Sequence, residues 1–202
     1  MTLDGPINYR FVLPPGWVHI PVDDEADDAV AALARKAAAR VEPSKRAKAE
    51  TFLREQLEQA VAGARAGKGQ DLYLPTEPVQ GMPLPISIVV GETRPPGDGV
   101  SFSTADALLS FASRSTGSRA SAIDGELAVR ATTVVPATDE LPGSRQITYL
   151  VCTPAPNPRL MLITAAILAL DVEGFPEIAD SLEFLFDSMV ATIRFERQAV
   201  PV

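Results

Sequence analysis

The chain has very little of the chemistry on which catalytic and metal sites depend. Its 202 residues include one cysteine, one histidine and one tryptophan. A single cysteine excludes an internal disulfide framework and is typical of a reducing compartment. One cysteine and one histidine cannot supply the four ligands of a structural zinc site. The sequence therefore predicts a protein that holds no metal and no other cofactor.

Long apolar runs are missing as well. The most apolar stretch, 160–170, has eleven residues, whereas a membrane-spanning helix needs roughly 20. The first residues, Met1–Pro6, do not combine a basic region with an apolar one, as a secretory signal peptide would. We therefore expect a soluble cytoplasmic protein without membrane insertion, and we expect the 160–170 run to form a buried strand.

Charge is unevenly distributed along the chain. Acidic residues outnumber basic ones by 26 to 18, which gives a net charge of −8. Segment 35–68 alone has nine basic and four acidic residues, for +5, so the remainder carries −13. An acidic body argues against general nucleic-acid binding, because the phosphate backbone attracts basic surfaces. The basic segment is either the solvated face of a helix pair or a contact site for an acidic partner, whose candidate residues are Lys45, Arg46, Lys48 and Arg54.

The two residues best suited to nucleophilic or acid–base chemistry stand in unremarkable surroundings. His19 lies in a short strand pattern beside Trp17, where a surface position or a hydrogen-bonded core position is expected. Cys152 lies in an apolar strand pattern without the cationic neighbours that lower a thiol pKa. We interpret Cys152 as a small core residue. Neither His19 nor Cys152 therefore indicates a catalytic site, and the sequence does not predict an enzyme.

Two other segments resemble ligand sites but fail on spacing. Segment 63–69 has three residues between its first two glycines, whereas a phosphate-binding loop has four, and Gly69 stands where that loop needs Ser or Thr. The carboxylates of 23–28 would need glycine at the sixth position and glutamate at the twelfth to form a calcium loop. Those positions hold Asp28 and Ala34. An acidic helix start explains them without a metal.

The order of the expected elements predicts an α+β fold in a single domain, 1–202, with a helical segment at about 24–66. Strands that follow one another through short turns favour an antiparallel sheet flanked by helices over a parallel sheet. The expected strands are 9–13, 17–20, 71–74, 86–90, 125–135, 146–153 and 159–170, and the expected helices are 24–40, 44–66, one from Ser103 or Thr104, and one from Pro176.

Helical spacing also predicts an apolar face on each of two helices. In the second helix one apolar stripe is expected, made of Ala49, Phe52, Leu53, Leu57, Ala60, Val61 and Ala64. In the last helix one face is expected to hold Ile178, Leu182, Leu185, Met189 and Ile193. The sequence does not tell whether such a face packs in the core or against a partner.

Segment Phe11–Pro21, which reads FVLPPGWVHIP, resembles the LPxGW…IP opening of Mog1/PsbP-like proteins. The stretch Gln146–Val151, the strand that follows to Leu170, and Ser181–Phe195 resemble the end of that pattern. The chain is more closely similar to a group of actinobacterial proteins of about 200 residues, and its fourteen arginines against four lysines suit a GC-rich genome. The resemblance implies an α/β/α sandwich and mostly non-enzymatic accessory or adaptor roles. It carries over no functional residue.

Three hypotheses of function follow. The first is a non-catalytic protein-interaction module, an accessory or adaptor protein that the resemblance associates with a secretion or cell-envelope system. The alternative is a small-molecule-binding protein or an enzyme, with a pocket between sheet and helices lined by Trp17, Tyr73 or Tyr149. The third is a structural subunit of a larger assembly, which an exposed apolar patch would favour.

Overall fold

The chain folds into two compact units, seen here in a computed structural model that describes residues 7–79, 81–93, 103–115, 117–138, 142–154 and 159–196. One unit is Pro15–Gly91, and the larger unit combines Met1–Pro14 with Glu92–Val202. Within the described ranges, no helix is both long and apolar enough to cross a membrane. The single-domain prediction for 1–202 stays a prediction.

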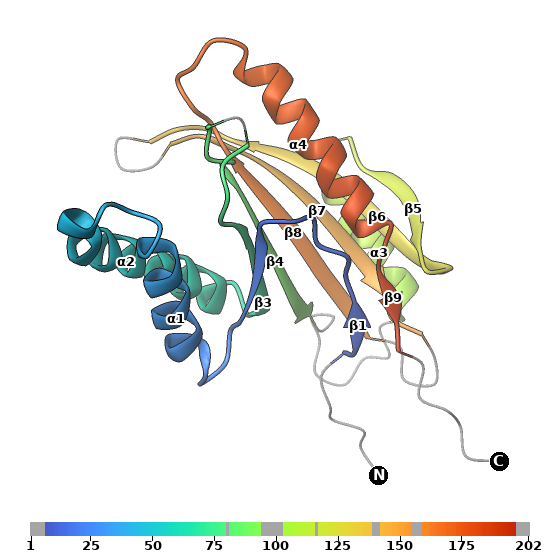
Figure 1. Cartoon of the computed structure of the whole chain (residues 1–202). Coiled ribbons are helices and arrows are strands. Elements are labelled where there is room, and N and C mark those ends of the chain that lie inside the picture. Colours follow the sequence, from blue (N-terminus) through green and yellow to red (C-terminus); the bar gives the residue numbers. More distant parts are fainter. Residues whose placement is uncertain are drawn as a thin grey trace. The chain divides into compact units, whose positions relative to one another are not determined.

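The Pro15–Gly91 unit is a three-stranded antiparallel sheet with a helical hairpin (Figure 1). The middle strand, β3, pairs with β2 on one side and β4 on the other. The helices connect β2 to β3, as the 24–66 helical segment predicted. The elements are β2 (Trp17–Pro21), α1 (Ala26–Ala38), the 3-10 turn η1 (Pro43–Lys45), α2 (Arg46–Ala66), β3 (Gly69–Pro75) and β4 (Ile86–Thr93).

Small residues let α1 approach its neighbours closely. Its buried residues recur every fourth position, which places them on one side of the helix. They are Ala26, Val30, Ala34 and Ala38. Ala26 and Val30 join a core that includes Ile20 of β2 and Leu72 of β3, with two residues from the C-terminal half of α2, Val61 and Ala64.

Two glycines allow β3 and β4 to meet where α2 ends. Gly69 is the register partner of Gly91, and the pairing is irregular between Gly69 and Asp71. A Cβ atom on Gly91 would lie 2.6 Å from the Lys68 carbonyl oxygen. Lys68 itself has φ = 58°, a left-handed backbone conformation that residues other than glycine seldom adopt. The close approach of β3 and β4 therefore depends on glycine at 69 and 91, whereas Lys68 adopts its left-handed conformation despite having a side chain.

The larger unit contains a four-stranded antiparallel sheet in the order β8-β7-β6-β5. A separate two-stranded pairing joins β1 to β9, near the two ends of the described chain. The elements are β1 (Tyr9–Arg10), α3 (Thr104–Arg114), β5 (Arg119–Ile123), β6 (Glu126–Val135), β7 (Ser144–Cys152), β8 (Leu160–Leu168), α4 (Phe175–Val190) and β9 (Arg194–Phe195).

Helices cover both faces of this four-stranded sheet (Figure 1). Ala107 and Leu108 of α3 pack against Val129 and Leu150, whereas the next residue of one strand, Arg130, bonds to α4. Adjacent strand residues point to opposite faces, so α3 and α4 lie on opposite sides. The unit is thus an α/β/α sandwich, and the predicted α+β class, an antiparallel sheet flanked by helices, is confirmed.

A tight hairpin joins β5 to β6. Its two turn residues, Asp124 and Gly125, have φ values of 52° and 85°, as a type I′ turn requires. Because β5 pairs only with Glu126–Arg130, β6 extends beyond it by the five residues Ala131–Val135. Those residues pair with β7 on one side, and within the described ranges no strand pairs with them on the other.

The predicted helices and strands agree with the structure, except for the short strands and those with a weak sequence signal. The 159–170 run forms β8, and Ser103 caps α3 with its side chain accepting from the Asp106 N–H. The first predicted strand is shorter, since β1 ends at Arg10. The strands β5 and β9 were not predicted. The sequence of 94–99, which contains Pro-Pro-Gly-Asp-Gly, predicts a surface turn, and this segment lies outside the described residues.

Candidate functional site

Four basic residues, predicted as a partner-binding site, lie at the beginning of α2 and in its first half. All four are exposed. Lys45 ends η1, and its ammonium lies 3.2 Å from Glu42. The Arg46 guanidinium turns back to donate to the Val41 carbonyl oxygen at 3.0 Å. Lys48 has no ion pair within the part of the chain that the structure describes. Lys48 therefore holds the charge most available to a partner, whereas the exposed Lys45 ammonium also pairs with Glu42.

Arg54 belongs to a different side of α2. Its Nε atom lies 2.8 Å from Glu58, and that hydrogen bond raises the pKa of the Arg54 guanidinium. On the same side a shallow depression of about 470 Å³ is lined by three glutamates and by Ala47, Thr51 and Arg54. Its glutamates are Glu50, Glu55 and Glu58. The predicted basic site is therefore divided, with Arg54 on a mixed-charge, self-neutralised surface.

Phe52 belongs to the predicted apolar stripe of α2, but the rest of the chain does not cover it. The Phe52 residue is 59% exposed. With 3.6 residues per turn, Phe52 points about 150° away from the direction shared by Leu57, Val61 and Ala64. The predicted stripe was too wide to fit against the sheet and α1, so its edge residue stays in water.

Phe52 lies in a stripe of α2 with a distinct composition. The residues seven and four positions before it are Lys45 and Lys48, and those four and seven positions after it are Gln56 and Gln59. Residues at these spacings follow one line along a helix. We call these five residues the Phe52 stripe. It combines an exposed aromatic ring with two cations and contains no carboxylate.

The charged end of α2 is also unusual for a helix. The first turn contains Arg46 and Lys48, and it has no acidic residue. The helix dipole disfavours positive charge at an N-terminus, typically by about 0.3–1 kcal/mol for each charge. The lysines of the Phe52 stripe are thus at the end of α2 where they do not stabilise the helix.

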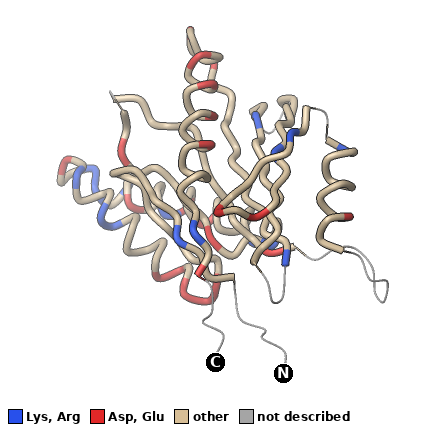
Figure 2. The backbone as a smooth tube through the Cα atoms, turned by 90° about the vertical axis from the view of Figure 1, so that its right-hand side faces the viewer, with Lys and Arg blue, Asp and Glu red and all other residues tan. Residues whose placement is uncertain are grey.

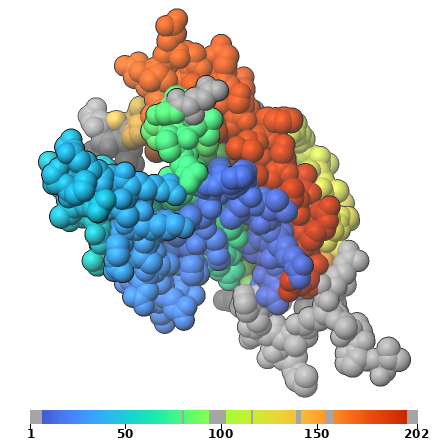
Figure 3. Space-filling model, viewed as in Figure 1, coloured from blue at the N-terminus to red at the C-terminus, as the bar shows by residue number. Residues whose placement is uncertain are grey.

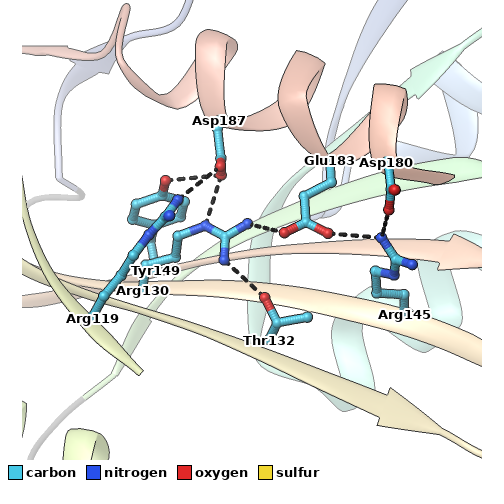
Figure 4. Close-up of polar contacts among 8 residues, drawn as sticks. All are labelled: Arg119, Arg130, Thr132, Arg145, Tyr149, Asp180, Glu183 and Asp187. Atoms are coloured by element: carbon cyan, nitrogen blue, oxygen red, sulfur yellow. Dashed lines mark hydrogen bonds and ion pairs between the residues drawn. The ribbon is translucent and has the colours of Figure 1, made fainter. Parts of the chain in front are cut away.

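The larger unit has a second polar cluster, which sequence reasoning missed. Arg130 of β6, only 5% exposed, lies beneath α4 (Figure 4). Its Nε donates to Asp187 at 2.9 Å, one Nη donates to Glu183, and the other donates to Thr132 at 2.8 Å. Burial lowers the pKa of Arg130, but the hydrogen bonds that Arg130 donates to both carboxylates outweigh this effect and raise that pKa above its usual value. Arg130 is therefore a permanent buried cation.

Three further side chains extend this cluster along α4. The Tyr149 hydroxyl donates to Asp187 at 2.9 Å, and burial, reinforced by that bond, raises the pKa of Tyr149 to about 12. Arg119 of β5 lies 3.1 Å from Asp187. Arg145 of β7 reaches Asp180 at 2.6 Å and Glu183 at 3.0 Å. Three arginines thus face three carboxylates, and we call the set the α4 ion-pair network.

The network pairs its charges internally, so its role is structural. It acts as a clamp that holds α4 against the sheet. It joins three successive turns of α4 to three strands, β5, β6 and β7 (Figure 4). Two signals in the sequence could have indicated it. Arg130 interrupts the apolar run of β6, and three carboxylates of α4 recur at spacings of three and four, namely Asp180, Glu183 and Asp187.

The remaining candidates from the sequence are placed as follows. His19 is exposed on β2, with Nε2 2.6 Å from Asp71 and its ring stacked on Tyr73 at 4.9 Å. Cys152 is half-buried and packs against the α3-facing cluster. Among the described residues, no group of three or more His, Cys, Asp or Glu side chains could hold a metal ion.

A second surface depression, of about 500 Å³, is lined by Arg10, Arg194, Phe195 and Glu196. Neither this depression nor the one on α2 is lined by Trp17, Tyr73 or Tyr149, the residues of the predicted pocket. Tyr149 is buried and engaged in the α4 ion-pair network. The ligand-binding alternative thus gains no pocket from these two depressions.

Comparison with known proteins gives a distant structural likeness. No family model and no curated protein matches the chain. Among solved structures, the chain is similar to the crystal structure of LpqN, involved in cell envelope biogenesis of Mycobacterium tuberculosis, with a TM-score of 0.49 and 11% identity over 96% of this chain and 88% of that one. A likeness of this degree assigns neither a family nor a function. The resemblance to Mog1/PsbP-like and actinobacterial proteins stays a prediction.

Proposed function

We propose that the protein is a non-catalytic interaction module, an accessory or adaptor protein that binds a protein partner through the Phe52 stripe of α2. The proposal places it in the cytoplasm and, through the resemblance alone, in a secretion or cell-envelope system. The observation that carries the proposal is the exposure of Phe52, 59% in the free chain, beside two lysines.

An exposed phenylalanine on this stripe is a source of binding energy. Burying a phenylalanine side chain completely is worth about 1.5–3 kcal/mol. With 59% of Phe52 in water, a partner that covered it would gain roughly 1–2 kcal/mol from this side chain alone. Aromatic residues are also enriched among the side chains that dominate interface energetics.

The charges of the stripe specify the chemistry of the partner. Lys48 and Lys45 lie about one and two helical turns from Phe52. A partner with carboxylates beside an apolar side chain would bind both kinds of group at once. Complementary charge of this sort mainly sets the rate and specificity of association. It would also offset the unfavourable position of the lysines at the N-terminus of α2.

Cross-linking in the native host, followed by purification of the tagged chain, tests the proposal. The wild type should retain a stoichiometric partner that a K45E/K48E double variant and an F52A variant lose. The R46E/R54E double variant is a matched control, because it reverses two charges on the same helix away from the Phe52 stripe. Equal retention by all variants, or recovery of the chain without a partner, would contradict the proposed function.

A further inference from the structure

The outward face of α4 has the same pattern as the Phe52 stripe, with the charges reversed. Phe184 is 74% exposed. The residues seven and four positions before it are Glu177 and Asp180. In the Phe52 stripe those two positions hold Lys45 and Lys48. The positions four and seven after Phe184 hold Ser188 and Ala191, which are small and uncharged.

Phe184 lies opposite the buried side of α4. At 3.6 residues per turn, it points about 170° away from the direction shared by the buried residues Leu182, Phe186 and Met189. The outward side of α4, orange to red in Figure 3, is part of the molecular surface. The Asp180 side chain on this side is 71% exposed, although it also pairs with Arg145. The ring and the carboxylate beside it are both accessible.

The helix as a whole matches a basic partner. Figure 2 shows acidic residues along α4, and the helix has four of them, with no lysine or arginine. They are Glu177, Asp180, Glu183 and Asp187. Glu183 and Asp187 are engaged with buried Arg130. Glu177 and Asp180 are therefore the carboxylates that face outward, next to Phe184.

We infer that α4 of one copy of this chain binds the Phe52 stripe on α2 of a second copy. A parallel alignment of the two helices brings Phe184 against Phe52, and Asp180 then faces Lys48 while Glu177 faces Lys45. Because both helices rise about 1.5 Å per residue, the seven-residue spans match at about 10 Å. An antiparallel alignment would place the lysines against Ser188 and Ala191, without opposite charge.

This inference rests on the proposed function, since it uses the same stripe and names its partner as another copy. The contact joins two different surfaces, so it is heterologous and builds rings or head-to-tail chains. Two helix faces form a smaller interface than a standard stable complex. We therefore expect a weak association that becomes visible only as protein concentration rises.

Sedimentation equilibrium over rising protein concentration tests this contact. The weight-average mass of the wild type should rise with concentration. F52A and F184A should each weaken association by about tenfold or more, since each removes a buried aromatic side chain. K48E and D180K should each weaken it by about three- to tenfold, as expected for one exposed ion pair turned into a repulsion.

The charge-swapped double variant K48E/D180K is the decisive measurement. It restores opposite charges at the contact, so its association should return to within about threefold of the wild type. R54E is the matched control on the other side of α2, and E173K is the control before α4. Circular dichroism verifies that each variant is folded, and F184A, which leaves the α4 ion-pair network intact, tests the same surface if D180K fails to fold.

Two results would overturn this inference. In the first, the chain stays monomeric at every concentration. In the second, the chain associates, but the double variant is no better than the single ones. The proposed function is judged separately: a different protein captured by the wild type and lost in F52A would support it, even when the chain itself is monomeric. If F52A retains both the captured protein and the self-association, the proposed function and this inference are both contradicted.

Discussion

Asp187 connects more groups of the α4 ion-pair network than any other carboxylate in it, and replacing it with alanine should destabilise the larger unit. One carboxylate oxygen accepts from Arg130 and from the Tyr149 hydroxyl, each at 2.9 Å, and the other pairs with Arg119 at 3.1 Å. In D187A, Arg130 keeps only Glu183 and Thr132 of its bonding partners. The buried Tyr149 hydroxyl loses its acceptor.

The magnitude follows from the burial of these groups. Removing one partner of a buried ion pair costs about 3–5 kcal/mol, and less where a second carboxylate remains. An unsatisfied buried hydroxyl adds about 1–3 kcal/mol. The exposed Arg119 contributes no more than about 1 kcal/mol. We expect D187A to lose about 3 kcal/mol of unfolding free energy, which corresponds to a Tm lower by roughly 6–12 °C for a chain of this size.

Urea unfolding followed by circular dichroism measures this loss. D180A is the comparison, since Asp180 is 71% exposed and its removal should cost less than about 1 kcal/mol. An R130M/D187L double variant should recover part of the loss, because apolar residues often replace a buried ion pair without cost. If D187A unfolds at the same urea concentration as D180A, the clamp interpretation of the network is wrong.

Other measurements test separate parts of the structure. The free energy of unfolding should be constant just below pH 10 and fall by about 2 kcal/mol as pH rises from 10 to 12. The pKa of Tyr149, ordinarily 10, is raised to about 12 in the folded chain, so the folded state resists deprotonation in this range. Y149F should lack this decline in a pH series. G91A should lose about 2 kcal/mol in urea unfolding, since its Cβ would lie 2.6 Å from the Lys68 carbonyl oxygen. By contrast G63A, in helix α2 with nothing within 4 Å, should gain about 0.5–1 kcal/mol. S103A should lose about 1 kcal/mol with the capping box of α3, and unchanged thermal stability would contradict that role.

The elements predicted correctly from sequence are those whose signal is local. β8 is an apolar run with β-branched residues, and the buried face of α4 repeats at helical spacing. β5 gave no such signal, because Arg-Ala-Ser-Ala-Ile has low strand propensity. It becomes a strand through its hairpin with β6, whose turn residue Gly125 was read as the first residue of the 125–135 strand.

The candidate sites depended on contacts that spacing does not encode. Helical periodicity correctly indicated which side of α2 is apolar, but not how much of that side its neighbours cover, so the exposure of Phe52 was not predicted. Arg130 and Asp187 are 57 residues apart, and only the packing of α4 on the sheet brings them together. Charge counts over 35–68 could not show that Arg54 is neutralised by Glu58 while Lys48 is not.

The overhang of β6 beyond β5 affects how the chain behaves at high concentration. Ala131–Val135 is uncharged, and four of its five residues are β-branched, a composition that favours pairing with other extended chains. Natural sheets protect such edges with charge, proline or bulges. Here Pro136 follows the segment at once and cannot donate a main-chain hydrogen bond, so it limits the length of any added strand. In destabilised variants we expect this edge, more than the exposed phenylalanines, to set the concentration at which the protein aggregates.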